Sequence, residues 1–206
     1  AEHDRGKERG WDRVSPFYIP TGICNSSGQI AIRTGFRGMC SCPVTACTGG
    51  TNAVATPSTY PGRYADVMLC GGTEAAVTPL AIGGFTSMKA LSQNPDPNRA
   101  SIPFDKERSG LFWAGAGVLL LEELSHAQKR GAKIYAELVG YGAPAMPPHD
   151  RAPARRSGAA KAMEMAIRDA APRRTKWTIS MPTHLYSLND AGETAAVKLV
   201  FGDHAR

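Results

Sequence analysis

The sequence lacks any long apolar run. Its most apolar stretch is residues 118–121, far short of the ~18 residues that a membrane-spanning helix needs, so no membrane span is expected. The first ten residues, AEHDRGKERG, are charged and unlike a secretory signal, which favours a cytoplasmic location. Hydrophobic residues make up 42% of the 206 residues, which is typical of a globular protein and argues against wholesale disorder.

Cysteine is scarce, and the chain is too long to depend on disulfides for its stability. The five cysteines are Cys24, Cys40, Cys42, Cys47 and Cys70. Because their number is odd and the chain is of ordinary domain size, a disulfide framework is not expected. The Cys40-Ser41-Cys42 motif has no nearby histidine and no second cysteine pair, so no metal site is expected either. With disulfides and a metal site not expected, the cysteines are interpreted as buried thiols, with one candidate reactive cysteine among them.

The net charge of +6 favours acidic partners in general. Much of the excess lies in two basic runs, residues 151–156 and 173–176. No helix-turn-helix, zinc-finger or RNP pattern accompanies either run, so both are interpreted as solvated faces and no nucleic-acid partner is expected.

Strand-like and helix-like segments alternate along the chain, which predicts an α/β fold. Strands are expected at residues 43–46, 65–70 and 133–139, and helices at 119–130, 157–171 and 190–201. Gly71-Gly72 should end the second strand, and Gly131 should stop the first of these helices. Asp190 is a candidate N-cap with Glu193 at the third helical position.

Cys47 stands where a short apolar segment enters a glycine-rich turn. A strand that feeds such a turn and then a helix is the geometry of a nucleophile elbow. The unpaired N–H groups and the dipole of a helix N-terminus favour a thiolate and can receive an oxyanion. The alternative is that Cys47 is a small apolar residue packed in the turn.

The turn is one of several segments that resemble a single family. Thr45-Ala46-Cys47, followed by Gly49-Gly50-Thr51-Asn52-Ala53, resembles the active-site segment of the β-ketoacyl-acyl-carrier-protein synthases, and most closely the synthase II-like enzymes. These are the elongating condensing enzymes of fatty-acid synthesis. Further segments match in the family's order, at residues 13–20, 65–80, 83–92, 100–108, 115–137 and 188–194.

The resemblance implies a thiolase-like layered α/β fold with two related halves, usually in a homodimer. By this match, residues 1–131 are the remainder of the N-terminal half and residues 132–206 begin the C-terminal half. The family's opening segment and most of its second half have no counterpart here, so the fold is expected to be incomplete.

The resemblance also implies a decarboxylative Claisen condensation. Cys47 takes an acyl group from a carrier-protein thioester, and the carbanion left when malonyl-carrier protein loses carbon dioxide attacks this acyl-enzyme. The partner is acyl carrier protein, whose phosphopantetheine carries the substrates, so no separate cofactor is expected. Lys89 lies where the family has a basic residue for carrier-protein contact. Phe85 lies where the family lines its acyl pocket, although a phenylalanine beside two glycines is equally expected in a core.

The sequence departs from the family at other functional positions. The family's lysine, its second histidine and its glycine-rich C-terminal loop have no counterpart. Pro182 occupies the position of the first histidine, and His184, two residues later, is more simply a surface residue. Glu193 matches a family carboxylate that supports the site, but its lysine partner is missing and a helix-capping role is simpler. The alternative function is therefore an inactive thiolase-fold remnant that binds a synthase subunit or acyl carrier protein.

The resemblance is lost and regained abruptly at residues 55–61, 111–114, 144–157 and 173–177. Pro57 and Pro61 stand where the family has a helix, and they should break it. Paired shifts of reading frame would produce such a pattern, so we hypothesise a partial, locally frame-shifted translation of a synthase gene. Resequencing the DNA and finding this frame intact throughout would overturn that hypothesis.

Overall fold

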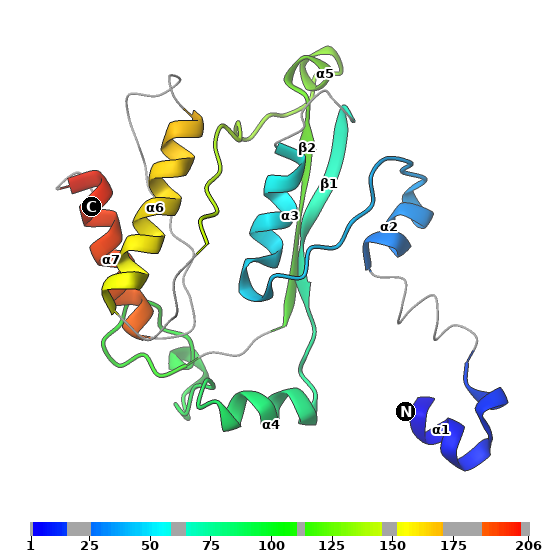
Figure 1. Cartoon of the computed structure of the whole chain (residues 1–206). Helices are drawn as coiled ribbons and strands as arrows, with labels where there is room; N and C mark the ends of the chain where they lie inside the picture. Colours follow the sequence, from blue (N-terminus) through cyan, green and yellow to red (C-terminus); the bar gives the residue numbers. More distant parts are fainter. Residues whose placement is uncertain are drawn as a thin grey trace. The chain divides into compact units, whose positions relative to one another are not determined.

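The chain, whose helices and strands are labelled in Figure 1, divides into two compact units. The computed structural model describes residues 2–15, 26–58, 65–110, 114–145, 152–170 and 187–202. Residues 1–71 and 119–132 belong to the first unit, and residues 72–118 and 133–206 to the second. None of the helices in these described ranges has the length and apolar character that crossing a bilayer requires.

Short helices make up most of the first unit. They are α1 (Glu2–Arg9), α2 (Ser26–Thr34), α3 (Gly49–Ser58) and α5 (Leu124–Lys129), with 3-10 turns η1 (Trp11–Arg13) and η3 (Ala46–Thr48). The strand expected at residues 43–46 is wrong, because residues 39–45 form neither helix nor strand. The Thr45 carbonyl instead accepts the Thr48 N–H at 3.2 Å, so it serves the turn and not a strand ladder.

Helix α3 continues further than its prolines suggested. Pro57 lies within its last turn, and the helix ends one residue later at Ser58. Proline lacks an amide hydrogen and crowds the preceding turn, which is tolerated where the helix is ending anyway. The expected break is thus limited to the helix C-terminus, and Pro61 lies outside the described residues.

Strands β1 (Val67–Glu74) and β2 (Gly115–Glu122) pair in a two-stranded sheet. The Glu123 N–H donates to the Asp66 carbonyl at 2.8 Å, and the Cys70 thiol donates to the Leu119 carbonyl at 3.7 Å. The partner numbers rise on one strand as they fall on the other, so the strands are antiparallel. The expectation that Gly71-Gly72 ends β1 is wrong, because pairing with β2 carries the strand on to Glu74.

The helix expected at residues 119–130 divides into a strand and a shorter helix. Residues 119–122 belong to β2, and α5 begins at Leu124 with Glu123 as its N-cap. A short leucine run fits a strand as well as a helix, which explains the error. The expected stop is confirmed, because Gly131 has a φ of 67° and Ala132 donates back to the Ala127 carbonyl at 2.9 Å.

Glu122 is the last residue of β2, and its carboxylate is held by hydrogen bonds from α5 and the residue after that helix. Its carboxylate accepts hydrogen bonds from Arg130 Nε and Nη2, each at 2.6 Å, and from His126. These donors, Arg130 foremost, lower the pKa of Glu122 to about 2. An unfolded glutamate titrates near about 4.3, so below that pH the unfolded chain binds more protons.

The contribution of Glu122 to stability should therefore be complete above about pH 4.3 and fall away as the pH drops towards its folded pKa. We expect Glu122→Gln to flatten the pH dependence of urea unfolding between about pH 5 and pH 3. Glu164→Gln is the control, because Glu164 is exposed and its ion pair with Lys161 spans 3.8 Å. An unchanged profile in Glu122→Gln would show that the cluster contributes nothing.

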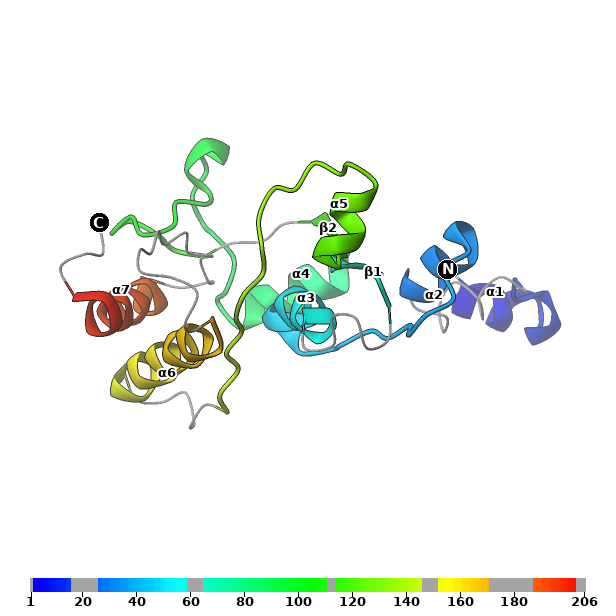
Figure 2. The ribbon, with the colours of Figure 1, turned by 90° about the horizontal axis from the view of Figure 1, so that it is seen from above.

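The second unit is built on α4 (Pro79–Ser87), the short turn η4 (Pro97–Arg99), α6 (Ala152–Ala170) and α7 (Ser187–Phe201). Helix α4 begins in a regular way, since Thr78 accepts the Ala81 N–H and Pro79 occupies the first turn. Helices α6 and α7 lie side by side in Figures 1 and 2 and are in contact. Each carries small buried residues, among them Ala160 on α6 and Ala196 on α7.

Helices α6 and α7 confirm the helices expected at residues 157–171 and 190–201, but both begin earlier than expected. Because α7 starts at Ser187, Asp190 lies within its first turn. The capping roles expected of Asp190 and Glu193 are therefore wrong. Asp190 instead turns its carboxylate into a buried contact, described below.

The strand expected at residues 133–139 is also wrong, since residues 132–145 form neither helix nor strand. A strand requires a neighbour to complete its ladder, and within the described residues the assigned pairing joins β1 and β2 alone. The segment instead approaches α6, where Tyr141 N–H donates to Asp169 Oδ2 at 3.0 Å.

Several expectations fall on residues that the structure does not describe. Cys24, Pro172, Pro182, His184 and the basic run 173–176 lie outside the described residues, as do the side chains of the run 151–156. Most of the stretches where the resemblance is lost also lie there. The predictions made for them stay predictions.

Candidate functional site

Cys47 lies on a tight turn that the sequence around it holds in place. Ala46, just before it, has a φ of 50°, in the left-handed region that residues with a Cβ rarely adopt. Thr45 braces the turn twice, since Thr48 Oγ1 donates to its carbonyl at 2.7 Å and Asn52 Nδ2 donates to its hydroxyl at 2.8 Å. The turn is thus fixed in an unfavourable backbone conformation, as is common at functional sites.

The thiol of Cys47 is accessible at the start of a helix. Cys47 is exposed, which excludes the alternative of a small residue packed in the turn. Helix α3 begins two residues later and has no acidic residue in its first turn. Such a helix start presents unpaired N–H groups and a positive dipole end, which suit a thiolate or an oxyanion.

The other described cysteines differ from Cys47 in their surroundings. Cys70 is buried on β1, and burial raises the pKa of its thiol, which disfavours the reactive thiolate. Cys40 and Cys42 are exposed like Cys47, but they lie in an irregular segment before the turn. Position on the turn, and not exposure, is therefore what distinguishes Cys47.

Phe85 lies in the last turn of α4 and Lys89 comes just after the end of that helix, both in the second unit. Phe85 is half-buried, and its carbonyl accepts the Ala90 N–H at 3.0 Å. Lys89 is exposed and has a φ of 56°, while its N–H donates to the Thr86 carbonyl at 2.9 Å. The lysine thus projects from a sharp left-handed turn. Cys47 belongs to the first unit.

A buried ion pair ties the loop after η4 to helix α7. The Arg108 guanidinium pairs with Asp190 Oδ1, and the two side chains are 1% and 9% exposed. The second carboxylate oxygen, Oδ2, accepts the Phe104 N–H at 2.8 Å, and Phe104 has a φ of 62°. We call Phe104, Arg108 and Asp190 the Asp190 clasp. Sequence reasoning missed it, although both partners lie in segments that matched the family.

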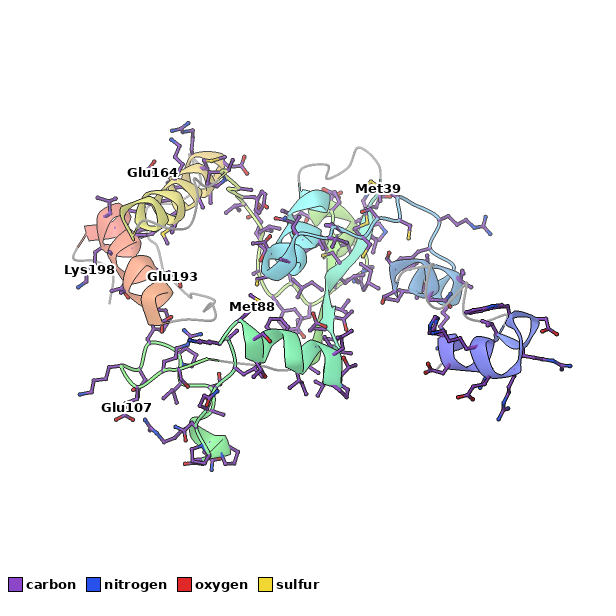
Figure 3. The ribbon with its side chains drawn as sticks, turned by 60° about the horizontal axis from the view of Figure 1, so that its bottom comes forward. Met39, Met88, Glu107, Glu164, Glu193 and Lys198 are labelled. Atoms are coloured by element: carbon purple, nitrogen blue, oxygen red, sulfur yellow. The ribbon has the colours of Figure 1, made fainter. Side chains whose placement is uncertain are left out.

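Glu193 comes after Asp190 on α7. Figure 3 labels its side chain and that of Lys198 on the same helix. Its side chain is half-buried, and burial raises its pKa, with a further rise from Asp190 and an opposing effect from Arg108. Glu193 is therefore coupled to the clasp through its charge. Its role as a supporting residue stays a prediction.

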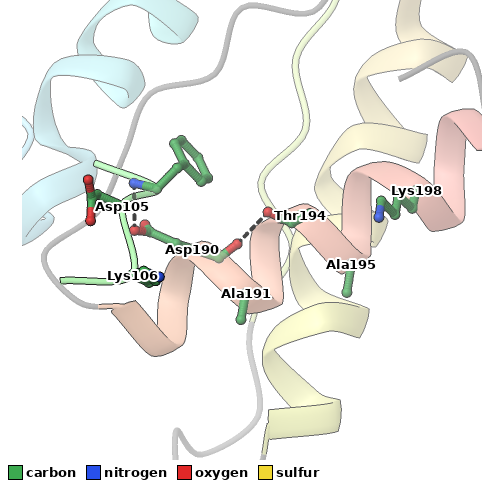
Figure 4. A pocket seen from close by; sticks show the side chains of 8 residues that line it. Asp105, Lys106, Asp190, Ala191, Thr194, Ala195 and Lys198 are labelled. Atoms are coloured by element: carbon green, nitrogen blue, oxygen red, sulfur yellow. Dashed lines mark hydrogen bonds between the residues drawn. The ribbon is translucent and has the colours of Figure 1, made fainter. Parts of the chain in front are cut away.

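A shallow pocket of about 540 Å³ opens beside the clasp (Figure 4). It is lined by Phe104, Asp105, Lys106, Asp190, Ala191, Thr194, Ala195 and Lys198. Thr194 Oγ1 donates to the Asp190 carbonyl at 2.7 Å, so its hydroxyl serves the helix. Throughout the described part of the chain, no group of three or more His, Cys, Asp or Glu side chains is placed to hold a metal ion.

Comparison with known proteins gives a consistent result. Residues 2–127 match the family described as "Beta-ketoacyl synthase, N-terminal domain". A protein of Synechocystis sp. named 3-oxoacyl-[acyl-carrier-protein] synthase 2 is 44% identical over 205 residues, which cover 96% of this chain and 49% of the relative. A Staphylococcus aureus protein of the same name is 40% identical over 210 residues, covering 99% and 52%. The chain thus spans about half the length of these curated relatives.

Solved structures agree with the sequence matches. One is described as a type II PKS acyl-carrier protein in complex with its ketosynthase bound to the hexaketide, with a TM-score of 0.79 and 32% identity over 95% of this chain and 50% of that one. A β-ketoacyl synthase from Burkholderia phymatum has a TM-score of 0.77 and 28% identity over 97% and 50%. These similarities confirm the α/β thiolase-like fold expected from the sequence.

Proposed function

Because this chain belongs to the β-ketoacyl synthase family, we propose that it is the nucleophile-bearing part of a synthase that elongates fatty acids. The observation that carries the proposal is the placement of Cys47. Its thiol is exposed on a strained turn at the start of α3, within the residues that match the family. That is the position from which a thiolate can attack a thioester.

In the first step, the Cys47 thiolate attacks the carbonyl carbon of an acyl group carried as a thioester. The carbonyl oxygen becomes an oxyanion, and we assign the N–H of Cys47 itself to part of its binding site. When the carbonyl re-forms, the bond to the carrier's sulfur breaks and that thiolate leaves with the electron pair. The acyl group is then a thioester of Cys47.

In the second step, malonyl-carrier protein loses carbon dioxide, and the carbanion that remains attacks the Cys47 thioester. A carbon–carbon bond forms, and Cys47 leaves as a thiolate. Dividing the reaction in this way holds the acyl group in place while the carbanion is generated. We assign this condensation to the whole protein, of which the chain spans about half by comparison with its relatives.

The partner in both steps is acyl carrier protein, which supplies the substrates on its phosphopantetheine arm. The net charge of +6 suits an acidic partner, and one similar structure is a ketosynthase in complex with its acyl-carrier protein. We assign Lys89 to carrier-protein contact, Phe85 to the acyl pocket and Glu193 to support of the site. A homodimer in the cytoplasm, with no separate cofactor, completes the proposal.

Acyl transfer to Cys47 tests the proposal directly. The 206-residue chain is incubated with acyl carrier protein charged with a saturated acyl group, and its intact mass is measured. We expect one acyl group per chain, lost on treatment with neutral hydroxylamine, and no label in Cys47→Ala because that variant has no thiolate on the turn.

Cys40→Ala and Cys42→Ala are the matched controls, because both cysteines are exposed and precede Cys47 by a few residues. Both variants should be labelled like the unmodified chain. Label that survives in Cys47→Ala would refute the assignment. A chain that binds acyl carrier protein but takes no label would show the inactive, carrier-binding alternative.

A further inference from the structure

The residues that follow Lys89 pack against the segment that carries Arg108. Gly110 is buried against residues 90 and 91. A Cβ at Gly110 would overlap the carbonyl oxygen of Ala90 and lie 2.6 Å from the carbonyl carbon of Leu91. Ala90 itself is 0% exposed. The backbone just after Lys89 therefore has no space to move towards residue 110.

A side-chain hydrogen bond joins the same two segments. Ser92 Oγ and Ser109 Oγ lie 3.2 Å apart, next to the contact between Gly110 and Ala90. Residues 90–92 and 108–110 thus meet through one close backbone contact and one hydrogen bond. Lys89 immediately precedes this contact and has a left-handed φ of 56°.

The segment 108–110 is itself held by the Asp190 clasp, through Arg108. Arg108 is two residues before Gly110, and its buried guanidinium is held by Asp190. Asp190 also holds Phe104 in a left-handed conformation, so one carboxylate fixes both ends of the loop 104–108. A continuous series of contacts therefore runs from α7, through Arg108 and Gly110, to Ala90 and the turn of Lys89.

We propose that Asp190 is a positioning residue that, through Arg108 and Gly110, fixes the turn from which Lys89 meets the acidic carrier protein. The inference rests on the proposed function, because it assigns Lys89 to carrier-protein contact. Asp190 is buried and does not touch the partner in this scheme. A lysine held in one place loses less conformational freedom on binding, so loosening its turn should weaken the complex.

The test is a thermodynamic cycle on carrier-protein affinity. Binding of acyl carrier protein to the 206-residue chain is titrated at low ionic strength, where exposed charges count most. We expect Lys89→Ala to weaken the Kd about threefold, the size of one exposed charge contact. Gly110→Ala and Asp190→Asn should weaken it about twofold to threefold, since they displace the lysine without removing it.

The double variants decide how these residues act. If Gly110 and Asp190 act through Lys89, then Lys89→Ala combined with Gly110→Ala should bind no more weakly than Lys89→Ala alone. Losses in the Kd that multiply to about sixfold to ninefold would overturn the inference, because independent effects combine in that way. Gly117→Ala is the matched control, since among the described residues, chain neighbours aside, no atom lies within 4 Å of the Cβ position at Gly117. It should bind like the unmodified chain.

Circular dichroism shows whether each variant is folded. Ser109→Ala provides a milder variant, because it removes the bond to Ser92 at an exposed position and leaves the buried pair intact. It should also weaken binding in a way that disappears when Lys89 is absent. If Ser109→Ala binds normally, and Gly110→Ala and Asp190→Asn also bind normally wherever they are folded, the inference is wrong. If Lys89→Ala itself binds normally, the proposed contact of Lys89 is wrong.

Discussion

Arg108→Ala should lower the free energy of unfolding by about 3–5 kcal/mol. The change removes a guanidinium that is 1% exposed and leaves the Asp190 carboxylate buried, with the Phe104 N–H as its remaining partner within the clasp. A buried charge that loses its counterion costs far more than the net value of the pair. Since typical domains are stable by about 5–15 kcal/mol, this loss is large.

Urea unfolding followed by circular dichroism measures the loss. Arg99→Ala is the matched control, because Arg99 pairs with Glu107 at 2.8 Å and with Asp105 at 3.6 Å while its side chain is 45% exposed. Water can replace an exposed partner, so the control should lose no more than about 1 kcal/mol. Equal losses in the two variants would contradict the buried character of the Asp190 clasp.

Gly142→Ala should destabilise the second unit by about 1–3 kcal/mol. Gly142 lies so close to α6 that a Cβ there would overlap the Ala162 carbonyl oxygen and lie 2.8 Å from Met165 Cβ. The backbone of a helix cannot yield as the tip of a flexible side chain can. The segment must therefore move away from α6, and it would lose contacts along its length.

The same alanine substitution at an open position provides the comparison. Gly117→Ala adds a Cβ that has no atom within 4 Å in the described part of the chain beyond its two chain neighbours. It should change the free energy of unfolding by no more than about 0.5 kcal/mol. Thermal and urea unfolding of both variants measure the difference. If Gly142→Ala is as stable as Gly117→Ala, the close approach to α6 carries no energetic weight.

Local signals in the sequence predicted the features that depend on local physics. The helices near residues 157–171 and 190–201 follow from composition and pattern, and Gly131 stops α5 because glycine accepts a left-handed conformation. The position of the turn at Cys47 was also predicted correctly, because Gly49 and Gly50 favour a tight bend before a helix. Each of these depends on residues within a few positions of one another.

The errors concern features that depend on distant partners. Residues 133–139 have the alternation of a strand, but a strand forms only where another backbone completes its ladder. The leucines of β2 fit a helix equally well until pairing with β1 decides the matter. Arg108 and Asp190 are 82 residues apart in the sequence. A local pattern in one sequence does not predict a contact between such distant residues.

Gly140 and Gly142 both face α6, and their spacing along the segment matches the spacing of the helix residues that they contact. Gly140 meets the carbonyl of Ala166, and Gly142 meets that of Ala162. Four residues of an α-helix, such as those from Ala162 to Ala166, rise about 6 Å. Two residues of extended chain, such as those from Gly140 to Gly142, span about 6.6 Å. The two distances are therefore nearly equal. A slip of one residue would bring Tyr141, with its bulky ring, against a helix carbonyl. Because both glycines lack a side chain, they fix the register of this segment along α6.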